Sequence, residues 1–210
     1  MKIWGAGTAR SLRPIWTAEE LGLVYDLIPI GPRTGETRTS EYTAMNPAQK
    51  IPLLEDKGML LSESVAICRY LIENYASDNL MPPQNTRHRA MEDQWCCYIY
   101  GEIDETSLYV MRRHQDLSEI YGTSPTVVSA AQSYAELHLG VVARKLGEKD
   151  FLMGEEFSLP DLLLMTCLDW AVNYGVTVPA SLLEYHQRIA QRPAYDRAMT
   201  INCTKRLMEK

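Results

Sequence analysis

A proline-containing linker near residue 80 separates two parts of the chain with different hydropathy patterns. Residues 79–86 read Asn-Leu-Met-Pro-Pro-Gln-Asn-Thr, and adjacent prolines flanked by polar residues are typical of a domain boundary. Before this linker, short strand-like runs alternate with segments of helical spacing, whereas only helical spacing follows it. The sequence therefore predicts an α/β domain over residues 1–78 and an all-helical domain over residues 87–210.

The first eighty residues predict the order β-α-β-α-β-β-α. Residues 2–5 and 24–30 are short strand-like runs, and residues 11–23 between them carry apolar side chains at helical spacing. A second helical piece ends before Pro47, because the residue that precedes a proline avoids helical backbone angles. Residues 51–61 then predict a hairpin with an Asp-Lys-Gly turn, and another helix follows.

The second half of the chain carries repeated helical stripes. A long helix is indicated by side chains that recur every three or four residues, and similar spacing occurs in residues 87–115, 159–174 and 182–190. Within the long stripe, His138 is expected to be a core histidine with a satisfied ring nitrogen rather than a metal ligand. The stripe consists of Val127, Ala131, Tyr134, Ala135, His138, Val141 and Val142.

The charge balance argues against nucleic-acid partners. The 210 residues include 21 Lys and Arg against 27 Asp and Glu, a formal net charge of −6, and affinity for nucleic acid depends on neutralising phosphates. The N-terminus has no apolar core of signal-peptide length, and no run approaches the ~18 apolar residues of a membrane span. We therefore expect a cytoplasmic protein with neither a nucleic-acid nor a membrane partner.

The cysteines and histidines do not suggest a disulfide framework or a metal site. Adjacent side chains on a helix diverge by about 100°, which disfavours a redox role for Cys96 and Cys97. The four histidines lie far apart and none stands beside a cysteine, so no metal is expected. Five thiols in helix-like stretches without a C-x-x-C motif are expected to be reduced and packed: Cys68, Cys96, Cys97, Cys167 and Cys203.

The segment from Asn46 to Leu54, Asn-Pro-Ala-Gln-Lys-Ile-Pro-Leu-Leu, carries the most specific local signal. A proline inside an apolar run cannot donate to a strand ladder, so Pro52 marks a sheet edge or a cis bond in a tight turn. In either case, the amide and carbonyl of Ile51 are left free to pair with a bound peptide.

Glu63 and Ser64 follow where a strand meets a helix. The N–H groups at a helix N-terminus attract a carboxylate, while Glu63 attracts an ammonium group. Together these features suit the zwitterion of an α-amino acid, with Ile51 nearby to hold an extended peptide. The simpler alternative is that the pair only caps the helix.

With these motifs in this order, the chain resembles the glutathione S-transferase family over essentially its whole length. The resemblance rests on residues 13–23, 46–54, 63–64 and 158–164, the last of which has the form of a helix capping box. It implies the glutathione S-transferase fold, with an α/β thioredoxin-like N-terminal domain and an all-α C-terminal domain. It also implies glutathione as co-substrate, no metal, and a homodimer.

The resemblance also assigns roles to the binding motifs. Pro52 would be a cis-proline, and Ile51 would pair through its backbone with the cysteinyl unit of glutathione. Glu63 and Ser64 would hold the γ-glutamyl end. Lys50 would reach a glutathione carboxylate or remain a solvated loop charge.

Glutathione transfer needs a hydrogen-bond donor that stabilises the thiolate. A free thiol titrates near ~8.5 and is only a few per cent ionised at pH 7, and the family places a Ser, Tyr or Cys between the first strand and the first helix. Residues 5–13 contain neither Tyr nor Cys, so the candidates are Thr8 and Ser11. Arg10 would add positive potential near the sulfur or be an ordinary surface arginine.

Pro14 suggests how the two hydroxyls divide their roles. A proline is best tolerated within the first four helical positions, which places the N-cap of the helix among residues 10–13. Ser11 is the only good N-cap there, so we expect Thr8 to be the catalytic hydroxyl, with Ser11 as the reserve. The extra methyl group of threonine restricts χ1, compared with serine.

The first helix of the second domain is expected to face either an acceptor substrate or a second subunit. By the resemblance, four of its residues would form an acceptor pocket facing Thr8: Tyr98, Asp104, Glu105 and Leu108. Its stripe of helically spaced side chains predicts a homodimer face, or packing on its own domain, through Met91, Trp95, Tyr98 and Glu102.

The expected function is attack of the activated glutathione thiol on a small, partly apolar electrophile. A glutathione-dependent peroxidase or disulfide reductase is an alternative, although residues 8–11 contain no cysteine for mixed-disulfide chemistry. A glutathione-binding module without turnover is another.

Overall fold

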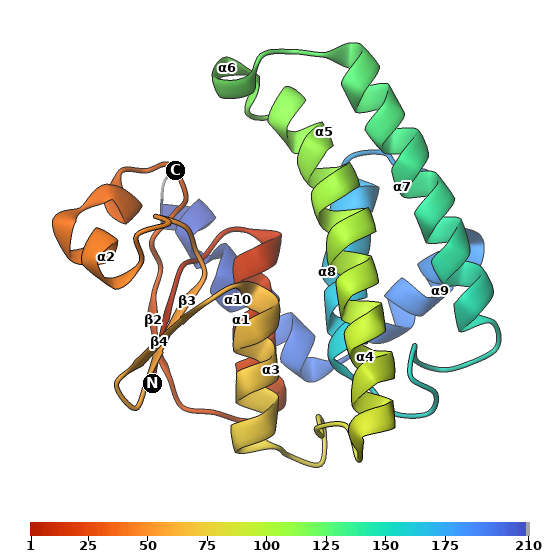
Figure 1. Cartoon of the computed structure of the whole chain (residues 1–210), viewed down its shortest axis with the longest axis horizontal. Helices are drawn as coiled ribbons and strands as arrows, with labels where there is room; N and C mark the ends of the chain where they lie inside the picture. Colours follow the sequence, from red (N-terminus) through yellow and green to blue (C-terminus); the bar gives the residue numbers. More distant parts are fainter. Residues whose placement is uncertain (209–210) are drawn as a thin grey trace. The chain divides into compact units, whose positions relative to one another are not determined.

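The computed structural model of the chain describes residues 1–208, with side chains up to residue 203, and it divides into two compact units (Figure 1). The first unit contains residues 1–82 and the C-terminal residues from 190 onward, and the second contains residues 83–189. The predicted helical domain, residues 87–210, included this C-terminal segment. In the structure the last helix of the chain, α10 (Pro193–Met208), packs on α1 (Ala9–Glu20) within the first unit.

A four-stranded mixed sheet forms the centre of the first unit, in the order β2-β1-β3-β4. β1 (Lys2–Trp4) pairs in parallel with β2 (Asp26–Ile28) and antiparallel with β3 (Leu53–Asp56). β3 forms a hairpin with β4 (Met59–Ser62). The predicted order of strands and helices is confirmed, although β1, β2 and β3 are shorter than the runs that predicted them.

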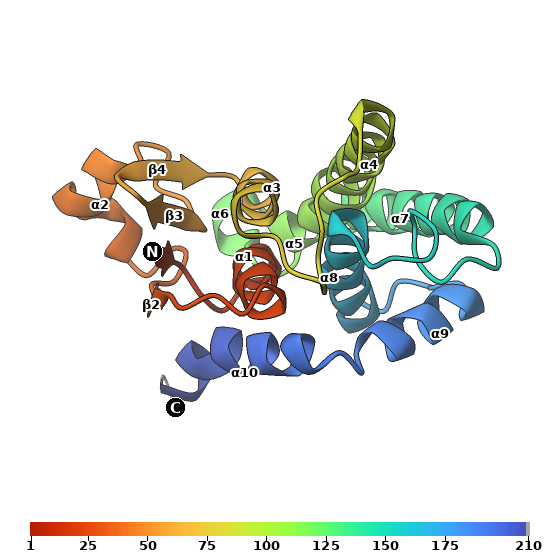
Figure 2. The same cartoon turned by 90° about the horizontal axis from the view of Figure 1, so that it is seen from below.

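Two helices cover one face of this sheet. α1 and α3 (Ser64–Tyr75) pack against each other there, while α2 (Ser40–Met45), which follows the short helix η1 (Glu36–Arg38), lies on the other side of the sheet (Figure 2). The apolar side chains of α1 and α3 recur at helical spacing, so each helix buries one stripe. Fully buried core residues between helices and sheet include Ile3, Ile15, Leu54, Ile67 and Leu71.

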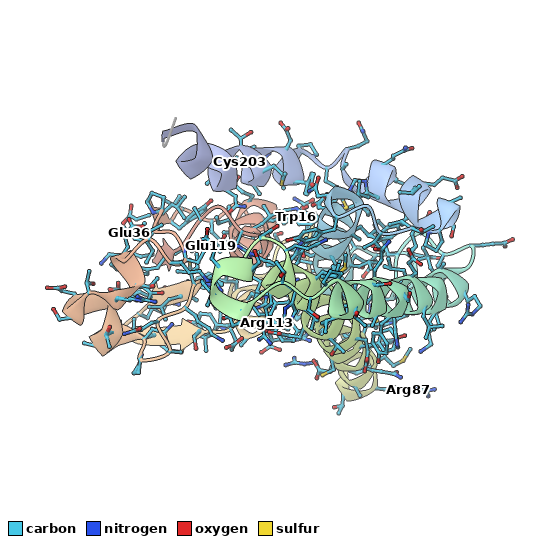
Figure 3. The ribbon with its side chains drawn as sticks, turned by 90° about the horizontal axis from the view of Figure 1, so that it is seen from above. Trp16, Glu36, Arg87, Arg113, Glu119 and Cys203 are labelled. Atoms are coloured by element: carbon cyan, nitrogen blue, oxygen red, sulfur yellow. The ribbon has the colours of Figure 1, made fainter. Side chains whose placement is uncertain are left out.

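Helix α10 is joined to α1 by a cluster of polar and aromatic contacts. Arg192, just before α10, forms a bidentate ion pair with the buried Glu20 at 2.7 and 2.8 Å. The indole of Trp16, labelled in Figure 3, donates to the same carboxylate at 2.9 Å. It also meets the ring of Tyr195 edge to face, with 4.9 Å between centroids. These contacts fix the beginning of α10 along the outer side of α1.

All the secondary-structure elements of the second unit, residues 83–189, are helices, as predicted. Asn85 caps its first helix by accepting from the amides of Arg87 and His88 at 3.0 and 3.1 Å, and this helix continues through a π-helical segment, η2. The elements are α4 (Thr86–Tyr98), η2 (Ile99–Leu108), α5 (Tyr109–His114), α6 (Ser118–Tyr121), α7 (Pro125–Leu146), α8 (Leu159–Asn173) and α9 (Ala180–Ile189).

The cysteines are free thiols, and most of them are packed as expected. Cys68, Cys96 and Cys167 are buried, Cys203 is half-buried and Cys97 is exposed. The adjacent pair therefore diverges, one thiol inward and one outward. Burial raises the pKa of the Cys68 thiol to about 12, so this group stays protonated at neutral pH.

A buried carboxylate organises the start of α8 in the second unit. Asp161 accepts from the amide and hydroxyl of Ser158 at 2.9 and 2.6 Å, which confirms the predicted capping box. It also accepts from the amide of Leu152 at 2.7 Å and from the hydroxyl of Tyr185 at 2.7 Å. Burial raises the pKa of the Asp161 carboxyl, and the bonds that it accepts oppose that rise.

A close contact in the first unit joins the loop after β1 to the loop before β3. Gly5 has a φ of +111°, and a Cβ placed on it would lie 2.6 Å from the Cβ of Ile51. Only glycine allows both this backbone angle and this approach. The β1–α1 loop and the Ile51 loop are therefore held against each other.

We expect Asp161→Ala to lower the free energy of unfolding by about 3 kcal/mol or more, because four buried donors lose their acceptor. Urea unfolding measures the change. Asp150→Ala is the control, since the Asp150 carboxylate is 72% exposed and lies 3.8 Å from Arg188; it should cost no more than ~0.5 kcal/mol. Equal losses in the two variants would contradict a structural role for Asp161.

We expect Gly5→Ala to lower the free energy of unfolding by at least ~1 kcal/mol more than Gly22→Ala. Both glycines have positive φ, so both variants incur the ~1–2 kcal/mol cost of left-handed backbone for an L-residue. Only Gly5 also has a neighbour within 4 Å. Urea titrations of the two variants isolate the effect of the close contact, and equal losses would show that the Ile51 loop moves aside freely.

Candidate functional site

Thr8 is the N-cap of α1. Its backbone is extended, with φ −130° and ψ 158°, and its hydroxyl oxygen accepts from the amide of Ser11 at 3.0 Å. In return, the Ser11 hydroxyl oxygen accepts from the amide of Thr8 at 3.0 Å. This reciprocal pair satisfies two N–H groups that a helix terminus otherwise leaves open.

The prediction that Ser11 is the N-cap is therefore wrong. Ala9 is the first helical residue, so Pro14 occupies the sixth position rather than one of the first four. Pro14 has no N–H to donate there, and the helix tolerates it in a fully buried environment. The position of Pro14 does not determine where this helix begins, because the reciprocal bonds between Thr8 and Ser11 fix its start.

The two hydroxyls differ in what can reach them. The side chain of Ser11 is completely buried, with 0% exposure, whereas Thr8 is partly exposed. The Thr8 oxygen accepts from the Ser11 amide and lies 2.9 Å from the Ser11 oxygen. Of the two residues, only Thr8 therefore presents surface to a ligand.

The Ile51–Pro52 peptide bond is cis, as expected. The preceding carbonyl, that of Lys50, accepts from the Tyr42 hydroxyl at 2.6 Å and from the Asn46 side chain at 2.9 Å. Among the described residues, no hydrogen bond uses the backbone amide or carbonyl of Ile51. The loop is thus anchored at Lys50, and Ile51 keeps its backbone groups available for an extended peptide.

Glu63 and Ser64 start α3 in an unusual backbone conformation. Glu63 occupies the N-cap position with φ 70° and ψ 114°, and no side chain caps this helix within the described residues. A non-glycine residue at such angles is strained, and strain of this kind concentrates at functional sites. Glu63 is exposed and Ser64 is buried, so the pair presents a carboxylate beside the open N–H groups of a helix N-terminus.

A fully buried arginine that the sequence pattern does not reveal donates a hydrogen bond to Ser64. Arg13 of α1 has 0% exposure, and its Nη1 donates to the Ser64 hydroxyl oxygen at 3.3 Å. Its positive charge therefore lies beside the N-terminus of α3, where a carboxylate is expected. An arginine between apolar neighbours gives no local signal of this role, because the contact spans 51 residues.

Asn202 of α10 is a second residue whose contacts the sequence does not predict, and it lies against the loop that carries Thr8. Its Oδ1 accepts from the amide of Gly7 at 3.0 Å and from the Ser11 hydroxyl at 2.9 Å, and its Nδ2 donates to the Thr8 carbonyl at 3.2 Å. The side chain is only 6% exposed. No pattern near residue 202 predicts these contacts with residues almost the whole chain away.

The remaining predicted residues are distributed over both units. In the first, Lys50 is exposed, and Arg10 is half-buried at the second position of α1. In the second, the Tyr98 hydroxyl lies 2.7 Å from His138 Nδ1. The other acceptor-pocket candidates comprise two fully buried residues, Asp104 and Leu108, and the half-buried Glu105, and the pocket itself stays a prediction.

The predicted dimer stripe on α4 is partly occupied by α7 of its own unit. Lys145 lies over the rings of Trp95 and Tyr98, at 5.3 and 5.6 Å from their centroids. Glu102 accepts from the hydroxyl of Tyr134 at 2.5 Å. Met91 is the stripe member that remains exposed.

The described residues contain neither a candidate metal site nor a candidate membrane-spanning helix. No group of three or more His, Cys, Asp or Glu side chains there is arranged to hold a metal ion. None of the helices in that range combines the length and hydrophobicity that crossing a membrane requires.

Comparison with known proteins gives matches along both units. Residues 1–73 match the family model of the glutathione S-transferase N-terminal domain, and residues 95–193 match that of the C-terminal domain. Glutathione S-transferase GstA of Escherichia coli O157:H7 is 31% identical over an alignment of 206 residues that covers 95% of this chain and 98% of that protein. Mouse glutathione S-transferase theta-1 is 28% identical, over 82% of this chain and 72% of the mouse protein.

A solved structure shows the same arrangement of elements. The theta class glutathione S-transferase from Xanthomonas axonopodis pv. citri, solved with glutathione bound, is 26% identical and superposes with a TM-score of 0.78. The match covers 94% of this chain and 95% of that one. Both domain models, a relative matched over nearly its whole length and this superposition agree that the chain belongs to the glutathione S-transferase family.

Proposed function

We propose that this glutathione S-transferase activates the glutathione thiol with the hydroxyl of Thr8 and directs the thiolate at a small electrophilic acceptor. The observation that carries the proposal is the geometry of the α1 N-cap. The Thr8 hydroxyl oxygen is fixed by the amide of Ser11 on a partly exposed residue, whereas Ser11 is fully buried. Thr8 is the donor and Ser11 completes its capping box.

The tripeptide would bind across the first unit. The free amide and carbonyl of Ile51 suit a strand-like pair of hydrogen bonds to the cysteinyl residue. That loop is pressed against the β1–α1 loop through Gly5, which brings the cysteinyl sulfur toward Thr8. The exposed Lys50 is available to a carboxylate of the same ligand.

The γ-glutamyl end would be bound at the start of α3. Glu63 pairs with its ammonium group, and the Ser64 hydroxyl and the N–H groups of the helix terminus receive its carboxylate. Since Arg13 donates to Ser64 Oγ, the Ser64 hydroxyl keeps its own hydrogen for the ligand. The buried charge of Arg13 adds to the same attraction.

One donated hydrogen bond accounts for useful activation. A hydrogen bond to a charged group contributes roughly 1.5–3 kcal/mol, which corresponds to one to two pKa units at about 1.4 kcal/mol per unit. The bound thiol would then titrate near ~7 rather than ~8.5, so about half of it would be thiolate at pH 7 instead of a few per cent. Arg10, at the same helix terminus, would strengthen this effect.

The names of the relatives favour transfer over the two alternatives. They are glutathione S-transferases, and neither a peroxidase or disulfide reductase nor a non-catalytic module is favoured by any of them. The sequence Thr8-Ala9-Arg10-Ser11 also offers no thiol for a mixed disulfide with glutathione.

The acceptor, the assembly and the cell compartment complete the proposal. The acceptor is a partly apolar electrophile that contacts the α4–η2 segment, and the protein is a cytoplasmic homodimer. Family membership supports the dimer. Each unit also exposes apolar side chains that a partner would cover: Met59 and Leu60 on the edge strand β4 of the first, and Met91 on α4 of the second.

Thr8→Val should raise the pKa of the bound glutathione thiol by one to two units and reduce turnover at pH 6.5 by ~10–100-fold, because it deletes the donor. Glutathione affinity should change little, and loss of the cap should cost about 1 kcal/mol of stability. The pH–rate profile with a chromogenic electrophile measures the shift. Thr8→Ser, which keeps the donor, is the control, and a Thr8→Val profile that overlays the wild type would exclude Thr8 as the donor.

Glu63→Ala should weaken glutathione binding by at least ~10-fold, since it removes a charge-assisted hydrogen bond of ~1.5–3 kcal/mol to the ligand's ammonium group. Isothermal titration calorimetry measures the change. Glu73→Ala removes the same charge from an exposed position on the same helix and should leave affinity unchanged. Equal affinities for the two variants would refute the γ-glutamyl assignment.

A further inference from the structure

We infer that Asn202, near the end of α10, is a positioning residue for the Thr8 hydroxyl. The inference rests on the proposed function and adds a residue from the opposite end of the chain to the catalytic machinery. Asn202 does not reach a reacting atom. Its buried amide instead holds the backbone on both sides of the Gly7–Thr8 peptide bond.

The orientation of the Asn202 amide is fixed by its partners. The Gly7 N–H can only donate, so the atom facing it at 3.0 Å is the oxygen Oδ1. The Thr8 carbonyl can only accept, so the atom facing it at 3.2 Å is Nδ2. The Gly7 amide also reaches the Asn202 backbone carbonyl at 3.0 Å, which ties the loop to α10 a second time.

The loop has little stiffness of its own. Gly5 and Gly7 have φ values of +111° and +81°, and glycines have the largest conformational freedom in an unrestrained chain. The capping box fixes Thr8 relative to the helix, while Asn202 fixes the peptide that precedes it. Both are needed to direct the Thr8 hydroxyl toward one point.

Asn202 also completes the capping box through Ser11. The Ser11 hydroxyl has two acceptors, Asn202 Oδ1 at 2.9 Å and the Thr8 carbonyl at 3.0 Å. Donation to either leaves a lone pair of the Ser11 oxygen directed at the amide of Thr8. α10 itself is held on α1 by the ion pairs of Arg192 with Glu20 and of Arg197 with Glu19. The C-terminal helix thus supplies a rigid support for the activating loop.

The test is a double-variant cycle on the full-length protein. We expect Asn202→Ala to raise the pKa of the bound glutathione thiol by about one unit. The absorbance of the thiolate, recorded against pH, measures this pKa. The affinity for glutathione should change less than twofold. The pKa of Thr8→Val should not rise further when Asn202→Ala is added, because Asn202 acts through Thr8. Asn74→Ala, at an exposed asparagine of α3, is the matched control and should leave the thiol pKa unchanged.

Three results would overturn the inference. An unchanged thiol pKa in Asn202→Ala, while Thr8→Val raises it, would refute the role of Asn202 and leave the proposed function intact. Additive shifts in the double variant would show that Asn202 does not act through Thr8. An unchanged pKa in Thr8→Val would instead refute the proposed function and this inference with it. Asn202→Leu, which retains the buried volume, replaces Asn202→Ala if the latter does not fold.

Discussion

The cap at the start of α1 is the contact on which the site depends. The hydroxyl of Thr8, the residue at the end of the loop after β1, satisfies an open amide of the helix, and Thr8 is partly exposed. In the proposed function the same oxygen serves the helix and the ligand, so the stability of α1 and the position of the donor are set together. Ser11 completes the reciprocal pair from a buried position.

The first unit is held together by contacts between distant parts of the chain. The cap contacts Asn202 of α10, the loop of Gly5 contacts Ile51, and Arg13 beneath the cap contacts Ser64. The three regions that would bind the tripeptide are thus connected through α1 and the loop that precedes it. A change in how α10 packs on α1 therefore reaches the thiol site without touching a ligand.

Local signals in the sequence predicted much of the fold and the binding motifs. The order of strands and helices along the first unit and the capping box of Asp161 each follow from residues a few positions apart, whereas the local sequence left Pro52 open between a sheet edge and the cis bond that is found. Long-range burial could not be predicted in this way, which is why the roles of Arg13 and Asn202 were missed. His138 illustrates the same limit: its ring nitrogen is satisfied, but by Tyr98 of another helix in a half-buried cluster rather than in the core.

The central claim is that this chain lowers the pKa of the glutathione thiol, and an ultraviolet titration of the wild-type protein–glutathione complex tests it directly. The account predicts a thiolate band that appears one to two pH units below the ~8.5 of a free thiol, in line with a single charge-assisted hydrogen bond. A complex that binds glutathione but titrates at the same pH as the free thiol would contradict the account and identify a binding protein without thiol activation.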